Sequence, residues 1–281
     1  MMYISDELIG RMIEEDVPYL DLTTWVLGIG KQQGVMEFFT RDQGVLCGTE
    51  EVKKIFEKLN VDLISALPSG SEIMPDQVFI TARGDAEALH MAWKVSQNIL
   101  DHCSGIATAA KHMVDEAKRA NPRAAVITTR KGFPGVKKLS TKAAMMGGAF
   151  PHRLGLSETV LVFKQHLNFL GGLESFITML PDIQCKICEK KIIVEADSVE
   201  EGKKLCQAGV DGIQFDKLAV HALEKGVKEI KAMNSHVSVL AAGGINISNA
   251  YEYAATGVDA LVTSSLYSAK PLDIGVRIRQ A

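Results

Sequence analysis

The sequence predicts an α/β protein made of a small α+β region, one long helix and a (β/α) barrel of fewer than eight units. Three observations carry this prediction. The chain has 281 residues, enough for one large domain or a large domain with a small partner. Helical periodicity begins at Ala86, and after Pro122 strand-like and helix-like stretches alternate regularly. Apolar residues make up 47% of the chain and charged residues 23%, which excludes disordered and fibrous classes.

The first 85 residues mix strand-like runs at 34–40, 44–48 and 77–84 with a helical segment at 50–59. From Ala86 to Ala120, small and apolar residues recur at alternating spacings of four and three, which predicts one long helix. Asn121-Pro122 ends it. Gly105 lies inside this helix, where glycine costs roughly 1 kcal/mol relative to alanine. We therefore expect another segment to approach Gly105 closely.

Six apolar, β-branched runs follow Pro122, each succeeded by an amphipathic stretch: 124–129, 159–163, 191–196, 211–216, 237–244 and 259–264. Strands that alternate with helices pair in parallel, and continuously apolar strands are buried on both faces. This repeat favours a barrel, with an open doubly wound sheet as the competing arrangement.

Charge and cysteine usage limit the partners. The formal net charge is −3, so no global field would hold a nucleic acid or an anionic membrane. The first twenty residues contain no apolar stretch typical of a signal peptide, and no uncharged span approaches ~20 residues. We expect a cytoplasmic protein without nucleic acid or membrane partners. Five cysteines suit free thiols, and Cys185-x-x-Cys188 alone is a weak zinc signal.

The unusual polar residues and glycines fall at the carboxyl ends of the predicted strands. They are Thr129, Arg130, Lys131, Lys164, Glu195, Asp216, Gly243, Gly244 and Ser264. Parallel α/β enzymes place their active sites at this end of the sheet. We therefore expect one site built from several strand ends.

The segment 130–164 is strongly basic within an acidic protein, which predicts a local anion site. Arg130, Lys131, His152 and Arg153 flank glycines and prolines, where side chains can converge on a ligand. The remaining lysines of the segment before Lys164 are equally well explained as the solvated face of a helix. They are Lys137, Lys138 and Lys142.

The stretch 240–246 places two glycines after a buried strand, with Asn246 or Ser248 as candidate helix caps. Backbone N–H groups at such a turn form a phosphate cradle. Glu195 and Asp216 end two neighbouring strands. Such acids hold Mg²⁺ together with a phosphate ligand, or accept hydrogen bonds from sugar hydroxyls.

Several motifs together resemble one enzyme family. They are DLTT (21–24), GVLCG (44–48), SGIAT (104–108), TTRKGFPG (128–135), GGAFPHRLGL (147–156), AAGGI (241–245) and GVDALVTSSL (257–266). Glu195 is followed 21 residues later by Asp216. In order and spacing these motifs resemble the quinolinate phosphoribosyltransferases, or nicotinate-nucleotide pyrophosphorylases, over nearly the whole chain. Within the family the sequence is similar to a paralogous branch associated with molybdenum transport.

The resemblance implies an N-terminal α/β sandwich over residues 1–105 and a seven-stranded open α/β barrel over 106–269, with the tail 270–281 packing back on the first domain. It implies a homodimer or higher homo-oligomer whose sites are shared between subunits. The reaction it implies is transfer of phosphoribose from phosphoribosyl pyrophosphate, with Mg²⁺, to the ring nitrogen of an aromatic acid.

The resemblance also assigns roles to residues. Arg130, His152 and Arg153 would bind the acceptor's carboxylate, and Lys131 would contact both substrates. Glu195 and Asp216 would hold ribose hydroxyls or Mg²⁺, directly or through water or substrate, and Gly243 and Gly244 would bind the 5′-phosphate. We expect catalysis to depend on Lys131, Glu195 and Asp216. The expected substrate-binding set is His102, Thr129, Arg130, His152, Arg153, Lys164, Gly243, Gly244 and Ser264.

The sequence departs from the family pattern on the acceptor side. His102 stands where the family has an arginine that reaches into the partner's site. With His166 in register, the acceptor-binding lysine falls on Phe163, although a shift of one residue would restore it as Lys164. Leu240, Ala242 and Ser264 replace an acid, a serine and a glycine. These departures indicate an acceptor that is not a dicarboxylate.

Two other classes of function stay open at this point. One is a non-catalytic oxyanion-binding or regulatory protein linked to molybdenum uptake, which would keep the fold and the basic pocket. The other is a barrel lyase in which Lys131 or Lys164 forms a Schiff base. The sequence leaves undecided the acceptor, any accompanying decarboxylation, dimer against hexamer, and the link to molybdenum.

Overall fold

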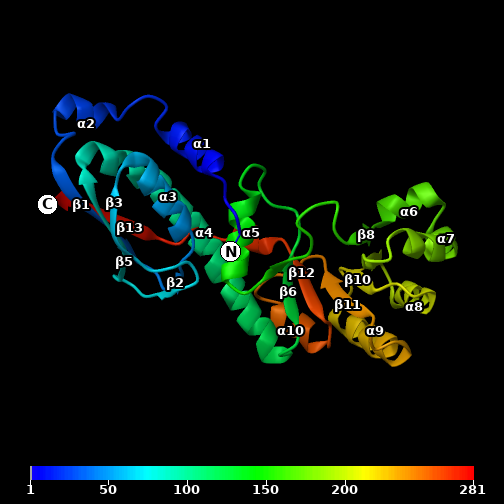
Figure 1. Ribbon diagram of the computed structural model, residues 1–281. Coiled ribbons are helices and arrows are strands. Elements are labelled where there is room, and N and C mark those ends of the chain that lie inside the picture. The colour runs from blue at the N-terminus through cyan, green and yellow to red at the C-terminus, as the bar shows by residue number, and fades with distance from the viewer. Residues whose placement is uncertain (1) are drawn as a thin grey trace. The chain divides into compact units, whose positions relative to one another are not determined.

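A computed structural model describes residues 2–281, and the chain forms two compact units (Figure 1). The first comprises the chain up to Lys111, Phe133–Gly148 and Tyr267–Ala281. The second comprises His112–Gly132 and Ala149–Leu266. The segment 133–148, expected in the barrel domain, thus belongs to the first unit.

The first unit is built on an antiparallel sheet of order β13-β1-β5-β3, with a second sheet of two strands, β2 and β4. Its strands are β1 (Gln33–Thr40), β2 (Gly44–Val45), β3 (Asp62–Ala66), β4 (Glu72–Ile73), β5 (Val78–Asp85) and β13 (Ile274–Gln280). Its helices include α1 (Asp6–Asp16), α2 (Leu22–Leu27), α3 (Thr49–Leu59) and α5 (Lys137–Met146).

The C-terminal segment completes the first sheet. Strand β13 pairs with β1 from Gly34↔Gln280 to Thr40↔Ile274, and in Figure 1 it is the red strand among the blue and cyan ones. The short helix η1 (Ser265–Ser268) precedes it.

The long helix α4 spans Ala86–Ala120, the range predicted from its periodicity. A side chain at Gly105 would overlap the backbone of Lys270 and Pro271. The expected close approach is therefore confirmed, and glycine is required here because backbone atoms cannot move aside cheaply.

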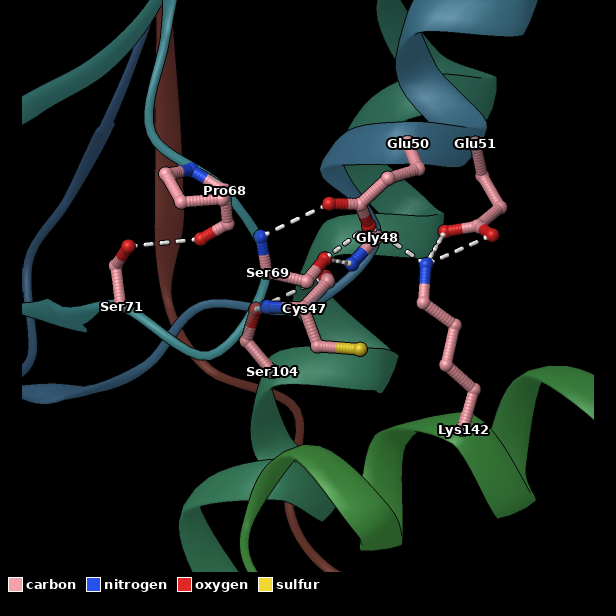
Figure 2. Close-up of polar contacts among 9 residues, drawn as sticks. All are labelled: Cys47, Gly48, Glu50, Glu51, Pro68, Ser69, Ser71, Ser104 and Lys142. Carbon is pink, nitrogen blue, oxygen red and sulfur yellow. Dashed lines mark hydrogen bonds and ion pairs between the residues drawn. The ribbon is translucent and has the colours of Figure 1, made fainter. Parts of the chain in front are cut away.

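A buried ion cluster joins α3 to α5 in the first unit (Figure 2). The Lys142 ammonium contacts Glu50 Oε2 at 2.7 Å and the two Glu51 oxygens at 2.9 and 2.6 Å. Ser69 also donates to Glu50 from its backbone N–H and its hydroxyl. The lysine side chain is only 2% exposed. The interpretation of Lys142 as part of a solvated face is therefore wrong. Two carboxylates compensate the charge of its ammonium group, which water would solvate at the surface.

The second unit is a curled parallel sheet of seven strands in the order β7-β6-β12-β11-β10-β9-β8. The strands are β6 (Ala125–Thr128), β7 (Phe150–Pro151), β8 (Val160–Val162), β9 (Ile192–Ala196), β10 (Gly212–Asp216), β11 (Ser238–Ala242) and β12 (Ala260–Thr263). Its helices are α6 (Lys164–Leu170), α7 (Leu173–Lys186), α8 (Val199–Ala208), α9 (Val220–Met233) and α10 (Ala250–Ala255).

This strand order is the chain order laid around a circle and cut between β7 and β8. The last strand, β12, pairs with the first, β6, which a doubly wound sheet does not do. The predicted fold class, an α/β sandwich domain with an open seven-stranded barrel, is confirmed. Small and branched side chains fill the barrel interior: Leu240, Ala242, Ala260 and Val262, against Ala125, Ile127 and Ile193.

Each of the six strand runs predicted after Pro122 contains an observed strand. Among the strands that were not predicted are β7, which has two residues, and β3, whose side chains are mostly exposed. Neither provides the alternation or apolar run that marks a strand. Within residues 2–281, no helix has the length and apolarity needed to cross a membrane.

Candidate active site

The carboxyl ends of the barrel strands surround a cavity of about 750 Å³ within the second unit. Ten of the predicted site residues line it: Thr129, Arg130, Lys131, His152, Arg153, Glu195, Asp216, Gly243, Gly244 and Ser264. They come from six of the seven strand ends or the loops that follow them, as parallel strands meeting at one edge require. One cavity therefore unites most of the predicted site.

Two predicted residues lie elsewhere. His102, on α4, lines a separate cavity of about 620 Å³ in the first unit. Lys164 is the first residue of α6, and its exposed ammonium lies 3.3 Å from Asp197 Oδ2. Its neighbour Phe163 lines the barrel cavity instead. The structure thus places an aromatic ring on the cavity wall and directs the lysine to an exposed ion pair.

One side of the cavity is cationic. The guanidinium of Arg153 is largely buried and donates to the Thr159 carbonyl at 3.4 Å. Burial lowers the pKa of Arg153, and the charge of Arg130 lowers it further. Two guanidinium groups that repel each other in a partly desolvated site are typical of a site for a carboxylate or phosphate.

His152 lies beside this pair. Burial lowers the pKa of the imidazole, and the Arg153 charge acts in the same direction, so the ring is neutral at neutral pH. Its two nitrogens are buried and make no hydrogen bond of ordinary geometry with residues 2–281. A neutral imidazole keeps one donor and one acceptor available for a ligand.

The opposite side is acidic. Glu195 is the penultimate residue of β9, and Asp216 is the last residue of β10. Burial raises the pKa of Glu195, and the neighbouring Asp216 charge raises it further. Lys131 and the Gln214 amide, whose Nε2 lies 3.1 Å from Glu195 Oε2, partly offset this. An incompletely compensated carboxylate pair favours binding of a metal ion, sugar hydroxyls or a developing positive charge.

A glycine turn follows β11. Gly243 and Gly244 have φ of 84° and 79°, a backbone region that glycine adopts readily. A side chain at Gly243 would collide with Asp216 and Lys217, whereas one at Gly244 would meet nothing within 4 Å. At Gly243 the backbone of the turn therefore packs closely against Asp216 and Lys217. At Gly244 the turn leaves open space for a ligand.

The predicted helix caps beyond this turn are wrong. Helix α10 begins at Ala250 with Asn249 as its N-cap residue, and no side chain accepts a capping hydrogen bond there. Asn246 and Asn249 instead brace the loop, because both side-chain amides donate to the Gly244 carbonyl at 3.1 Å. The loop following the glycines, rather than a helix start, shapes this part of the cavity.

Several lining residues were not predicted as site residues, among them Phe163, Gln214 and Lys217. Phe163 was noted only as a replacement. Gln214 shares the inner face of β10 with Asp216, so period-two alternation could have identified it. Lys217 has φ of 55°, and its N–H donates to the Ala242 carbonyl at 2.8 Å. No sequence pattern indicates that conformation at a lysine.

The metal-binding capacity of the chain is limited. No group of three or more His, Cys, Asp or Glu suited to a metal ion occurs among the described residues. Cys185 and Cys188 are free and exposed. Glu195 and Asp216 provide two carboxylates, so a magnesium ion would need further oxygens from substrate and water, which is how Mg²⁺ is usually bound.

Comparison with known proteins identifies the family. Residues 106–277 match the quinolinate phosphoribosyl transferase C-terminal domain, and residues 21–104 match the N-terminal domain. "Putative pyrophosphorylase ModD" of Pasteurella multocida is 33% identical over 280 residues, covering 100% of this chain and 99% of the relative. The human "Nicotinate-nucleotide pyrophosphorylase [carboxylating]" is 30% identical over 272 residues, covering 96% and 90%. The chain belongs to the quinolinate phosphoribosyl transferase family.

Solved structures agree with the fold. The crystal structure of NadC from Streptococcus pyogenes superposes with a TM-score of 0.90 over 100% of both chains, at 22% identity. Membership of this family makes the protein a phosphoribosyltransferase, as predicted. The oxyanion-binding and Schiff-base alternatives are not favoured.

Proposed function

We propose that the protein transfers the phosphoribosyl group of phosphoribosyl pyrophosphate to a ring nitrogen of an aromatic monocarboxylate. The observation that carries this proposal is the division of one cavity into two sides. Arg130, His152 and Arg153 follow β6 and β7 on one side, and Glu195 and Asp216 lie at the ends of β9 and β10, with the glycine turn after β11, on the other. A flat aromatic anion suits the cationic side, and a phosphorylated sugar suits the side with the acids and the glycine turn.

The reaction needs one bond made and one broken. The lone pair of the ring nitrogen forms the bond to C1′ of the ribose, and the C1′–oxygen bond breaks with its electron pair leaving on pyrophosphate. Positive charge develops on the ribose in between. Glu195 and Asp216 would stabilise that charge and accept hydrogen bonds from ribose hydroxyls, because preorganised charges act strongly in a partly desolvated site.

The cations between the two sides would hold the leaving group and the substrates in place. Lys131 acts electrostatically on Glu195, and Lys217 lies beside Asp216 and the glycine turn. We propose that Lys131 contacts both substrates, that Gly243 and Gly244 bind the 5′-phosphate, and that Lys217 binds pyrophosphate. Thr129 and Ser264 provide further hydroxyl groups at the cavity wall.

We propose Mg²⁺ as the cofactor, held by Glu195 and Asp216 together with substrate oxygens. The raised pKa of Glu195 beside Asp216 is the supporting observation, because a divalent cation would relieve that repulsion. When bound, the ion would neutralise charge on the pyrophosphate.

The apolar residues that line the cavity indicate how many carboxylates the acceptor carries. Phe163 and Leu161 are apolar residues that line the same cavity. A second carboxylate against them would be desolvated without a partner, which is costly. One carboxylate is matched by the two guanidinium groups, so a monocarboxylate fits better than quinolinate.

We also propose a homodimer in which residue 102 contributes to the partner's site, as the family resemblance implies. Light scattering tests the first part, and an active monomer would contradict it.

Pyrophosphate release tests the proposed function directly. Phosphoribosyl pyrophosphate and Mg²⁺ would be supplied with a panel of pyridine and other heteroaromatic monocarboxylates, and with quinolinate. We expect acceptor-dependent release with at least one monocarboxylate, and loss of that release in Arg153→Met. Release with none would support an oxyanion-binding protein, and borohydride trapping of a carbonyl substrate on Lys131 would support a lyase.

A further inference from the structure

One buried side chain in the barrel cavity has hydrogen-bonding capacity that the proposed roles leave unused. Gln214 lies in the middle of β10, is 4% exposed and lines the cavity. It is in register with Glu195 on β9 on one side and Leu240 on β11 on the other. A carboxamide in such a position is costly unless both of its ends are partnered.

The orientation of this amide is fixed by Glu195. The Gln214 Nε2 donates to Glu195 Oε2 at 3.1 Å. Rotating the amide by 180° would place its oxygen against a carboxylate and replace attraction by repulsion. The carbonyl oxygen Oε1 therefore points away from Glu195, and it has no hydrogen-bond partner in the part of the chain that the structure describes.

His152 lies with Gln214 in one corner of the cavity, where a hydrogen-bond interaction with the Gln214 side chain raises the imidazole pKa and so opposes the effect of burial. Neither imidazole nitrogen has a partner of ordinary geometry among residues 2–281. Because the ring is neutral, it provides one donor and one acceptor. With Gln214 Oε1, this corner holds two acceptors and one donor.

One donor cannot satisfy two acceptors, so in either tautomer of His152 at least one acceptor lacks a donor from these two side chains. If the imidazole N–H donates to Gln214 Oε1, the second imidazole nitrogen is unmatched. If it donates to a bound carboxylate, both acceptors are unmatched. Within residues 2–281, the neighbouring Arg153 donates to the Thr159 carbonyl and not to this corner.

We propose that Gln214 determines acceptor specificity by accepting a hydrogen bond from an N–H group of the aromatic acceptor. The acceptor class is then an aromatic monocarboxylate that also carries an amino, carboxamide or lactam N–H. This inference rests on the proposed function. It adds the second feature by which the cavity recognises its acceptor, beside the carboxylate held by the arginines.

Paired probes test this inference. Nicotinates substituted at each ring position with either an amino or a methyl group are nearly equal in size but differ in the N–H. Calorimetric titration of the wild-type enzyme should show at least one position where the amino probe binds about tenfold more tightly, as one buried hydrogen bond predicts. At that position a dimethylamino probe, which lacks the N–H, should lose the preference.

Two variants locate the effect. Gln214→Met keeps the side-chain length and removes the carbonyl, so the amino preference should fall to about onefold while the methyl probe binds at least as well. Gln165→Met removes an exposed amide from the same cavity and should leave the preference intact. The wild-type titrations remain decisive if Gln214→Met does not fold.

Equal binding of amino and methyl probes at every position would overturn the inference, and so would a preference that survives Gln214→Met. If methyl probes bind and support pyrophosphate release without any gain from the amino group, only this inference fails. If no probe binds and none supports release, the proposed function fails and the inference fails with it.

Discussion

The ion cluster of the first unit and the barrel cavity of the second contain the same kinds of charged group in opposite balance. Lys142 lies between Glu50 and Glu51, and Ser69 completes the contacts of Glu50 (Figure 2). These contacts outweigh burial and lower the pKa of Glu50 to about 2, with the hydrogen bond from Lys142 the largest of them. Each charge in the cluster has its partner within the chain.

The barrel cavity separates its charges by sign. Burial and the Arg130 charge lower the pKa of Arg153, while burial and the Asp216 charge raise the pKa of Glu195. Both shifts disfavour the charged forms. A charge satisfied internally stabilises the fold, whereas a charge left beside a like charge is available for a ligand.

Removing the cluster's cation should have the largest effect on stability. Lys142→Met leaves two carboxylates buried without a counter-ion, and we expect unfolding free energy to fall by about 3–5 kcal/mol. Denaturant unfolding measures it. Lys138→Met, on the same helix but exposed over the Tyr3 ring, should cost under about 1 kcal/mol. Equal losses in the two variants would show that the buried contacts of Lys142 contribute no more to stability than the exposed contact of Lys138.

Acid should weaken the same cluster. The pKa of Glu50 lies below its ordinary value in the folded state, so its stabilisation is complete above the unfolded value and is lost as pH falls through the folded one. We expect up to about 3 kcal/mol to disappear between pH 5 and pH 2. Unfolding of wild type and Glu50→Gln across that range measures it. Parallel pH profiles would contradict the prediction.

Removing a charge from the cavity should raise stability, whereas removing one from the ion cluster should lower it. Glu195→Gln should reduce kcat/KM by roughly 10²-fold or more, because it removes charge that stabilises the transition state. The same change should raise stability at neutral pH by about 0.5–2 kcal/mol. A carboxyl group whose pKa is raised in the fold destabilises it once ionised.

Asp197→Asn is the matched control for this comparison. Asp197 is an exposed acid that follows β9 and pairs with Lys164. Neither activity nor stability should change appreciably in this variant. A loss of stability in Glu195→Gln would show that the cavity's acids are structural.

Acceptor charge provides a smaller test. Adding cations by His102→Arg with Phe163→Lys should raise kcat/KM for quinolinate by roughly tenfold to a hundredfold, the range of one charge-assisted hydrogen bond. Each single change should give less, since both cations would act on one dianion. Wild-type turnover of quinolinate above about 10⁴ M⁻¹s⁻¹ would contradict the account.

The comparison also explains what the sequence could predict. Strand runs such as IIVEA and GIQFD are apolar and periodic, so the barrel and the acids at its strand ends follow from pattern alone. Gly105 indicated a close approach, which the backbone at Lys270 provides. Strand β13 was not predicted as a strand, because its pairing with β1 joins residues more than two hundred positions apart.

Side-chain pairing was harder to predict than backbone pattern. Lys142 and Lys164 both belong to the basic segment, yet one is buried between glutamates and the other lies on the surface beside Asp197. Both outcomes depend on partners from distant elements. The unpartnered oxygen of Gln214 likewise depends on how Glu195 fixes the amide, which no local pattern records.

The most direct test of the central claim, that the cavity's unbalanced charges await a phosphoribosyl substrate and its metal, is thermal unfolding with phosphoribosyl pyrophosphate and Mg²⁺. At a hundred times its dissociation constant, a ligand that binds only the folded state adds about 2.7 kcal/mol. We expect the wild-type melting temperature to rise accordingly, and the rise to vanish in Gly243→Ala, whose side chain would collide with Asp216 and Lys217. A wild-type melting temperature unmoved by saturating substrate and metal would contradict the claim.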